Sequence, residues 1–220
     1  MLNELYKKAK QENADMVICD YFTHFTSGIR YNKQCPSSLD ASVVLCELFQ
    51  QLHGSCWNKL VRRACYNKFG VRFPTGVAYC EDLLTNATLL THDIRVAYLN
   101  KAFYHYDNTS NTNSIVSQCT LADFHRNEHL LALMCEALRG TPAEPLGAAR
   151  IGNSLLRRCF RGRFFTSREF RRHCRKYINY CFVGSDKFFC LFLYISCLGA
   201  YRLAYNSWEG MRKIKHTIRK

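Results

Sequence analysis

The sequence predicts an α/β fold over about the first 118 residues, followed by a helical region. Strand-forming apolar runs alternate with helical patterns up to residue 118, and only helical patterns follow. The chain contains only 11 glycines and 4 prolines, which is few for a turn-rich all-β protein. The hydrophobic fraction of 48% with 22% charged residues argues against a disordered chain or a coiled coil. We therefore expect two parts, residues 1–118 and 119–220.

The first part opens with a helix and a buried strand. Apolar residues within 2–9 share one helical face, and residues 14–22 (A-D-M-V-I-C-D-Y-F) form a strand-type run between polar segments. We expect a loop over residues 26–40, because Gly and Pro occur there, and a helix over residues 41–52. A short extended piece over residues 54–60 follows.

The rest of the first part contains further short elements. A helical turn is expected over residues 62–66 and an extended piece over residues 71–74. Residues 81–90 form a helix that opens with two acids, which suit the positive end of its dipole. Residues 94–99 and 102–106 alternate like two paired strands.

The second part is helical throughout. Thr120 and Asp123 have the spacing of a capping box, which predicts a helix that ends at Gly140. Residues 141–147 contain two of the four prolines and are expected to be a linker. Three helical patterns follow, over residues 149–160, 167–181 and 186–204.

The formal charge of +14 is concentrated in the last third of the chain. Residues 1–150 contain 15 Lys and Arg against 14 Asp and Glu, whereas residues 151–220 contain 16 against 3. Basic helices with interleaved aromatic rings suit an anionic membrane surface, and the same composition suits nucleic-acid phosphates. A plain solvated face is the third interpretation. We favour the membrane, because the sequence contains no recognisable nucleic-acid-binding module.

Cysteine usage and terminal composition predict the compartment. The 13 cysteines form no C-x-x-C pair, and most lie in apolar runs, so we expect buried free thiols in a reducing cytosol. The first residues have neither the basic nor the apolar region of a signal peptide. The longest uncharged stretch that is mainly apolar, residues 188–201, falls short of the ~20 residues that span a bilayer. We therefore expect a cytoplasmic protein, peripheral at the inner face of the cell membrane.

Four motifs occur in a characteristic order. Residues 4–22 combine a helix and a strand, and W-N-K-L at residues 57–60 is followed by Arg62-Arg63 and F-P at residues 73–74. An E-D pair comes next, and Y-H-Y with N-S-I closes the series within residues 104–115. In this order and spacing, residues 1–118 resemble the C-terminal, acceptor-side part of family-2 glycosyltransferases.

The resemblance implies a partial GT-A-like (Rossmann-like) fold and an inverting sugar transfer. Inversion needs one carboxylate that deprotonates the acceptor hydroxyl as it attacks. In the family this role belongs to the Asp of the E-D motif, here Asp82, and Glu81 would support it or orient the acceptor. The alternative interpretation is that both acids only complement a helix dipole.

The resemblance also implies the residues that bind the acceptor. Trp57 would stack on a sugar face, Asn58 and Lys59 would contact the acceptor or a donor phosphate, and His105 would face the cleft. A core indole, a solvated strand end and a structural histidine are the alternatives for these positions. Asp107 stands where the family often has an Arg after Y-x-Y, which puts that phosphate contact in doubt.

One family feature is missing from the sequence. The family holds a divalent metal, Mg or Mn, through a D-x-D pair in a nucleotide-binding half, and this sequence contains no D-x-D. We therefore expect a truncated glycosyltransferase that does not act alone, and a separate N-terminal half is a possible partner. Its function would be transfer of a sugar from a nucleotide sugar to a saccharide or lipid-linked acceptor in surface-polysaccharide biosynthesis. The alternative is a non-catalytic membrane- or partner-binding module.

Overall fold

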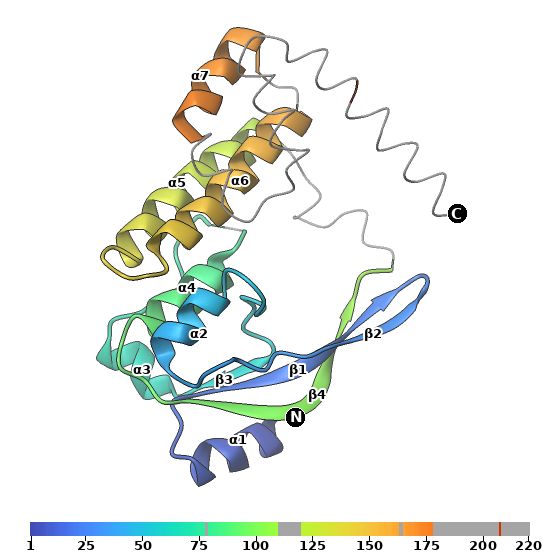
Figure 1. The fold of residues 1–220 in the computed structure, drawn as a ribbon, viewed down its shortest axis with the longest axis vertical. Coiled ribbons are helices and arrows are strands. Elements are labelled where there is room, and N and C mark those ends of the chain that lie inside the picture. Colours follow the sequence, from blue (N-terminus) through green and yellow to red (C-terminus); the bar gives the residue numbers. More distant parts are fainter. Residues whose placement is uncertain (78, 110–119, 163–164, 178–206, 208–220) are drawn as a thin grey trace. The chain divides into compact units, whose positions relative to one another are not determined.

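The computed structural model describes residues 1–77, 79–109, 120–162, 165–177 and 207 (Figure 1). Within these residues the chain is a mixed α/β protein with one four-stranded sheet. The expected α/β class is confirmed at this level. The chain divides into two compact units, one of Met1–Ser117 with Ala132–Gly147 and one of Gln118–Leu131 with the residues from Ala148 on.

The sheet of the first unit is built around β1 (Met16–Phe25). β4 (Val96–Asp107) pairs with β1 in parallel along almost its whole length. β2 (Gly28–Asn32) and β3 (Lys59–Val61) pair with opposite ends of β1, both antiparallel, and so share its other edge.

Two strands differ from the sequence-based expectation. β2 lies within residues 26–40, which were expected to be a loop. The strand pair expected over residues 94–99 and 102–106 is instead one continuous strand, β4, with an irregular register opposite Cys19 and Asp20. Its parallel pairing with β1 carries the strand through Asn100 and Lys101, which bulge rather than turn.

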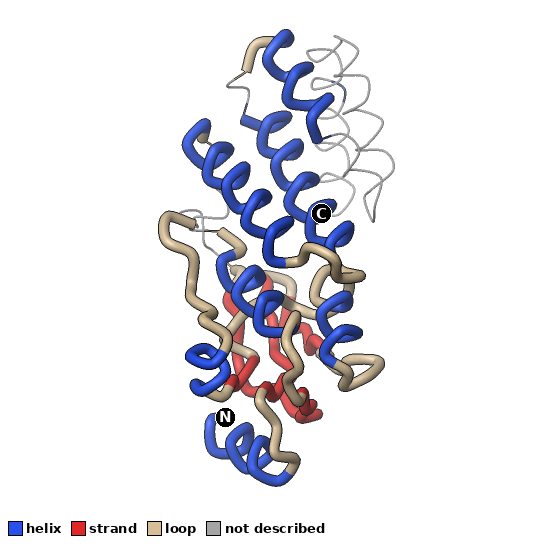
Figure 2. The backbone as a smooth tube through the Cα atoms, turned by 90° about the vertical axis from the view of Figure 1, so that its left-hand side faces the viewer, coloured by secondary structure: helices blue, strands red, loops and turns tan. Residues whose placement is uncertain are grey.

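Helices cover both faces of this sheet (Figures 1 and 2). α1 (Leu2–Gln11) lies on one face and buries Leu5 in a cluster with Val17, Cys19 and Ala97. α2 (Ala41–Glu47) and α4 (Glu81–Leu90) lie on the other face. α3 (Arg63–Lys68) follows β3. The helices expected at the start of the chain and over residues 81–90 are confirmed.

The remaining described helices are α5 (Leu121–Ala137), α6 (Glu144–Gly162) and α7 (Ser167–Tyr177). The expected capping box opens α5: the Asp123 amide donates to Thr120 Oγ1 at 3.2 Å, and the Thr120 amide donates to Asp123 Oδ2 at 2.9 Å. α6 begins inside the expected linker, because Pro145 fits the first turn of a helix. The helix expected over residues 186–204 lies outside the described residues.

None of the described helices is both long and apolar enough to cross a membrane. The apolar stretch at residues 188–201 is outside the described part of the chain, so the structure does not bear on it.

Candidate functional site

A loop before β3, residues 53–58, carries several of the predicted site residues and is fixed at its base by Lys59. Lys59 is buried, and its Nζ donates to three oxygens: the carbonyls of His53 at 2.6 Å and Ser55 at 2.8 Å, and Asn58 Oδ1 at 2.9 Å. Burial lowers the pKa of Lys59 to about 7, against the opposing attraction of nearby acidic groups. We call residues 53–58 the anchored loop.

The first turns of α4 hold the same loop from another direction. Asn86 Nδ2 donates to the carbonyls of Gly54 at 2.9 Å and Ser55 at 3.2 Å. Asp82 Oδ2 accepts the amide of Cys56 at 3.0 Å. The predicted base therefore lies at the amino end of α4, bonded to the residue that precedes Trp57.

The indole of Trp57 belongs to an aromatic cluster. Its ring stacks on Tyr104 at a centroid distance of 4.3 Å and on Tyr106 at 5.8 Å, with interplanar angles of 14° and 19°. Tyr21 at 4.8 Å and His53 at 5.1 Å complete the cluster. Trp57 remains partly exposed. The two tyrosines were not among the predicted site residues, although their alternate spacing in Y-H-Y places them on one face of a strand.

The structure does not bring the polar ends of Asn58 and Lys59 to the surface. Asn58 is fully buried, and its Nδ2 donates to the Cys19 carbonyl at 3.0 Å while Ser55 Oγ donates to its Oδ1 at 3.0 Å. The polar groups of both residues are thus used inside the loop. Their direct contact with an acceptor stays a prediction.

The other two predicted residues have different surroundings. Glu81 lies in the first turn of α4 and is partly exposed, next to Asp82. His105 is exposed and points to the opposite side of β4 from Tyr104 and Tyr106, because strand side chains alternate. Its ring stacks on Phe22 at 4.8 Å, and its Nδ1 lies 2.7 Å from His24 Nε2. The structure therefore links Asp82 to the loop that carries Trp57, whereas His105 points away from the Trp57 cluster.

A buried carboxylate on β1 was missed by the sequence analysis. Asp20 is fully buried and accepts hydrogen bonds from the hydroxyls of Tyr31 and Tyr98 and from the amide of Gln34. The hydrogen bond to Asp20 raises the pKa of Tyr31 to about 12. Burial and the same carboxylate raise the pKa of Tyr98. Asp20 therefore ties β2 and β4 to the central strand.

The described residues do not fit the divalent metal that the resemblance implies. No group of three or more His, Cys, Asp or Glu side chains among them could hold a metal ion. Both carboxylate oxygens of Asp20 already accept hydrogen bonds from protein groups. We derive no chemical step through a metal here.

Two cavities lie away from the anchored loop. One, of about 380 Å³, is lined by residues of α1 and β3, and includes Tyr6 and Leu60. The other, of about 520 Å³, is lined by residues near the start of α2 and after α4, and includes Asp40 and His92. Neither cavity is lined by Asp82 or Trp57, so we place the candidate site by its chemistry rather than by cavity volume.

Among the cysteines whose side chains are described there is no disulfide; Cys19 and Cys65 are buried, as expected, whereas Cys35 is exposed and the others are partly exposed. Burial raises the pKa of Cys19 and of Cys56 to about 11, so both thiols are protonated at neutral pH. Neither has the character of a nucleophile.

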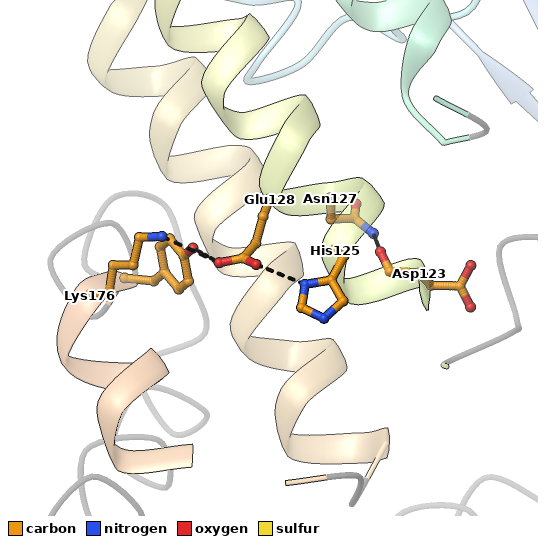
Figure 3. Close-up of polar contacts among 6 residues, drawn as sticks. Asp123, His125, Asn127, Glu128 and Lys176 are labelled. Atoms are coloured by element: carbon orange, nitrogen blue, oxygen red, sulfur yellow. Dashed lines mark hydrogen bonds and ion pairs between the residues drawn. The ribbon is translucent and has the colours of Figure 1, made fainter. Parts of the chain in front are cut away.

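A second polar cluster occurs in the other unit, where Glu128 of α5 meets α7 (Figure 3). Glu128 accepts a hydrogen bond from the buried Tyr177 hydroxyl and lies 3.3 Å from Lys176 Nζ and 3.1 Å from His125 Nδ1. Burial alone would raise the pKa of Glu128, but these partners outweigh it and lower the pKa. The cluster fastens α7 to α5.

No protein-family model matches the sequence, and no curated protein matches it. The fold and the site therefore define the chain no further than as a mixed α/β protein with a carboxylate and an aromatic cluster held by one loop.

Proposed function

We propose that residues up to about 118 are the acceptor-side part of an inverting, GT-A-like glycosyltransferase. The supporting observation is the hydrogen bond from the Cys56 amide to Asp82, which ties this carboxylate to the backbone of the residue that precedes the partly exposed Trp57. A sugar acceptor needs both groups: a flat ring against its apolar face and a base near its hydroxyl. The donor would be a nucleotide sugar and the acceptor a saccharide or lipid-linked saccharide.

In this proposal Asp82 takes the proton of the acceptor hydroxyl. The acceptor oxygen then bonds to the anomeric carbon as the nucleotide diphosphate leaves. Asp82 lies in the first turn of α4, and the Cys56 amide fixes one of its carboxylate oxygens. In this proposal the described residues bind neither the nucleotide-sugar donor nor a metal, and another part of the enzyme binds both.

The test compares Asp82→Asn with Asp93→Asn, a matched change of a carboxylate outside the anchored loop. Each variant is incubated with labelled nucleotide sugars and membranes of the native host, and transfer to saccharide and lipid acceptors is measured. Asp82→Asn should lower the rate by about 10²–10⁴-fold, because it removes the base and keeps the shape. Asp93→Asn should leave the rate unchanged. Equal rates for the wild type and Asp82→Asn would exclude Asp82 as the base.

A second candidate function is a non-catalytic module that binds an anionic membrane at the inner face of the cell membrane. The observation that favours it is the exposure of Arg168, Arg172, Arg175 and Lys176 on α7. The three arginines follow the helical spacing of one face, and Tyr177 on the same helix is buried. Such a helix would bind headgroup phosphates by charge. This function is compatible with the first.

A further inference from the structure

We infer that Lys59 is a positioning residue that holds the anchored loop in shape and thereby sets the placement of Asp82 and Trp57. The inference rests on the proposed function only in calling the loop an acceptor-side element. It replaces the direct acceptor contact expected for Lys59 with a role inside the protein.

The hydrogen bonds of the ammonium group account for all its donors. A lysine ammonium has three N–H groups, and Lys59 Nζ has three oxygen acceptors at 2.6–2.9 Å. The side chain is buried. No donor of Lys59 is therefore left for a bound sugar or phosphate, and the cation is satisfied by the loop itself.

The three acceptors are spread along the loop. His53 supplies a carbonyl at its start, Ser55 one in the middle, and Asn58 a side-chain oxygen at its end. The Lys59 ammonium thus hydrogen-bonds to the start, the middle and the end of the anchored loop. Because Asn58 is also bonded to Cys19 of β1, the loop is tied to the central strand.

The loop is held on its other side by α4. Ser55 O accepts from both Lys59 Nζ and Asn86 Nδ2, and the next amide, that of Cys56, donates to Asp82. Lys59 and Asn86 therefore hold the loop at the Ser55 carbonyl, and Asp82 holds it at the Cys56 amide. Trp57 follows directly, so its ring position depends on both anchors.

The experiment uses the full chain with Trp208→Phe, which leaves Trp57 as the only indole. Lys59→Met removes the three donors at nearly constant volume, and Lys68→Met is the control at an exposed lysine. Acrylamide quenching of Trp57 should rise by about twofold or more in Lys59→Met, because the loop opens locally. It should not change in Lys68→Met. Far-UV circular dichroism and a melting curve report separately on the fold.

Unchanged quenching in a folded Lys59→Met variant would overturn the inference. If that variant does not fold, the wild type gives a second measurement, the rate of reductive methylation of each lysine by mass spectrometry. Although its lowered pKa leaves more free amine, Lys59 should react at least about tenfold more slowly than Lys68, because reagent reaches its buried nitrogen only when the loop opens locally. Equal rates would also overturn the inference. Neither measurement depends on sugar transfer, so a failed Asp82 test would leave this result standing.

Discussion

Gly54 shows how closely the anchored loop approaches α4. A Cβ at this position would lie 2.7 Å from Leu83 Cδ1, 2.8 Å from Leu83 Cβ and 3.2 Å from Leu83 Cα. Two of these neighbours sit at the root of the side chain or in the backbone, so a rotation of Leu83 cannot relieve the overlap. Only a glycine fits between the loop and the helix at this point.

Gly54→Ala should therefore displace the loop and destabilise the protein by about 1–3 kcal/mol. The displacement should also raise acrylamide quenching of Trp57 in the Trp208→Phe background. Gly70→Ala is the matched control: its φ of +66° disfavours alanine, but its Cβ would meet no atom. The control should lose stability without a change at Trp57. A Gly54→Ala variant with native quenching would contradict the close fit.

The role of Asp20 could have been predicted from its position in the sequence, although it was not. An aspartate inside a buried strand-type run must be paired or hydrogen-bonded, since an isolated buried charge is costly. That rule alone singles out Asp20 in M-V-I-C-D-Y-F. Its partners Tyr31 and Tyr98 lie 11 and 78 residues away, and only the pairing of β2 and β4 with β1 identifies them.

Among the elements, α7 depends on its attachment to α5 through Glu128. Tyr177→Phe removes the buried hydroxyl that donates to this carboxylate and should cost about 1–3 kcal/mol. Hydrogen exchange of the α7 amides measures the loss locally. Lys176→Met, which removes an exposed partner of the same carboxylate, should cost less than about 1 kcal/mol. The reverse order of the two variants would contradict this account.

The same attachment has a predictable acid dependence. The partners of Glu128 lower its pKa in the folded protein, so their stabilisation is complete above the unfolded pKa of about 4.3 and is lost as the pH falls through the folded pKa. In Tyr177→Phe the folded pKa lies closer to the unfolded value. Exchange in α7 should therefore differ between wild type and variant at pH 6 and converge near pH 3.

Helices and strands were predicted where their own residues carry the periodic pattern, and were missed where the element depends on a partner strand. The helix over residues 81–90 and the strand over residues 14–22 carry their patterns in their own residues, and both were found. β2 has only five residues, G-I-R-Y-N, and they are mostly exposed at the edge of β1, so its pattern was too short to predict a strand. The continuity of β4 depends on its partner strand, which local alternation cannot reveal.

The candidate site divides in the same way. Asp82 and Trp57 were predicted because their motifs are local, and the structure hydrogen-bonds Asp82 to the amide of Cys56, the residue before Trp57. The burial of Asn58 and Lys59 was not predictable, because their hydrogen bonds close a loop whose conformation no pattern describes. Tyr104 and Tyr106 join Trp57 only through the sheet.

For the whole molecule, the uneven charge predicts where an anionic membrane would bind. A triple variant of α7, with Arg168, Arg172 and Arg175 changed to Gln, should weaken binding to anionic vesicles by about tenfold or more, at about 1 kcal/mol per basic residue. Vesicle flotation measures the binding. The same number of charges removed at Lys10, Arg63 and Lys68, which are also exposed, should have a much smaller effect.

The dependence of vesicle binding on salt and on lipid composition tests whether the binding is electrostatic. Binding by charge should vanish in high salt, because surface electrostatics are screened, and with neutral lipid, because such a surface has no net charge. Equal effects of the two triple variants would show that net charge, not α7, drives the binding. Indifference to both lipids together with tight, salt-sensitive DNA binding would exclude the membrane as the partner.

The bulge in β4 has a consequence for self-association. β1 uses one edge for β4 and the other for β2 and β3, and no strand of the described residues pairs with the far edge of β4. A straight twelve-residue edge would be a template for a second copy of the chain. The bulge at Asn100 and Lys101 interrupts the regular edge in its middle, and Lys101 adds a positive charge there. Both features disfavour edge-to-edge pairing of two copies and hence fibril formation.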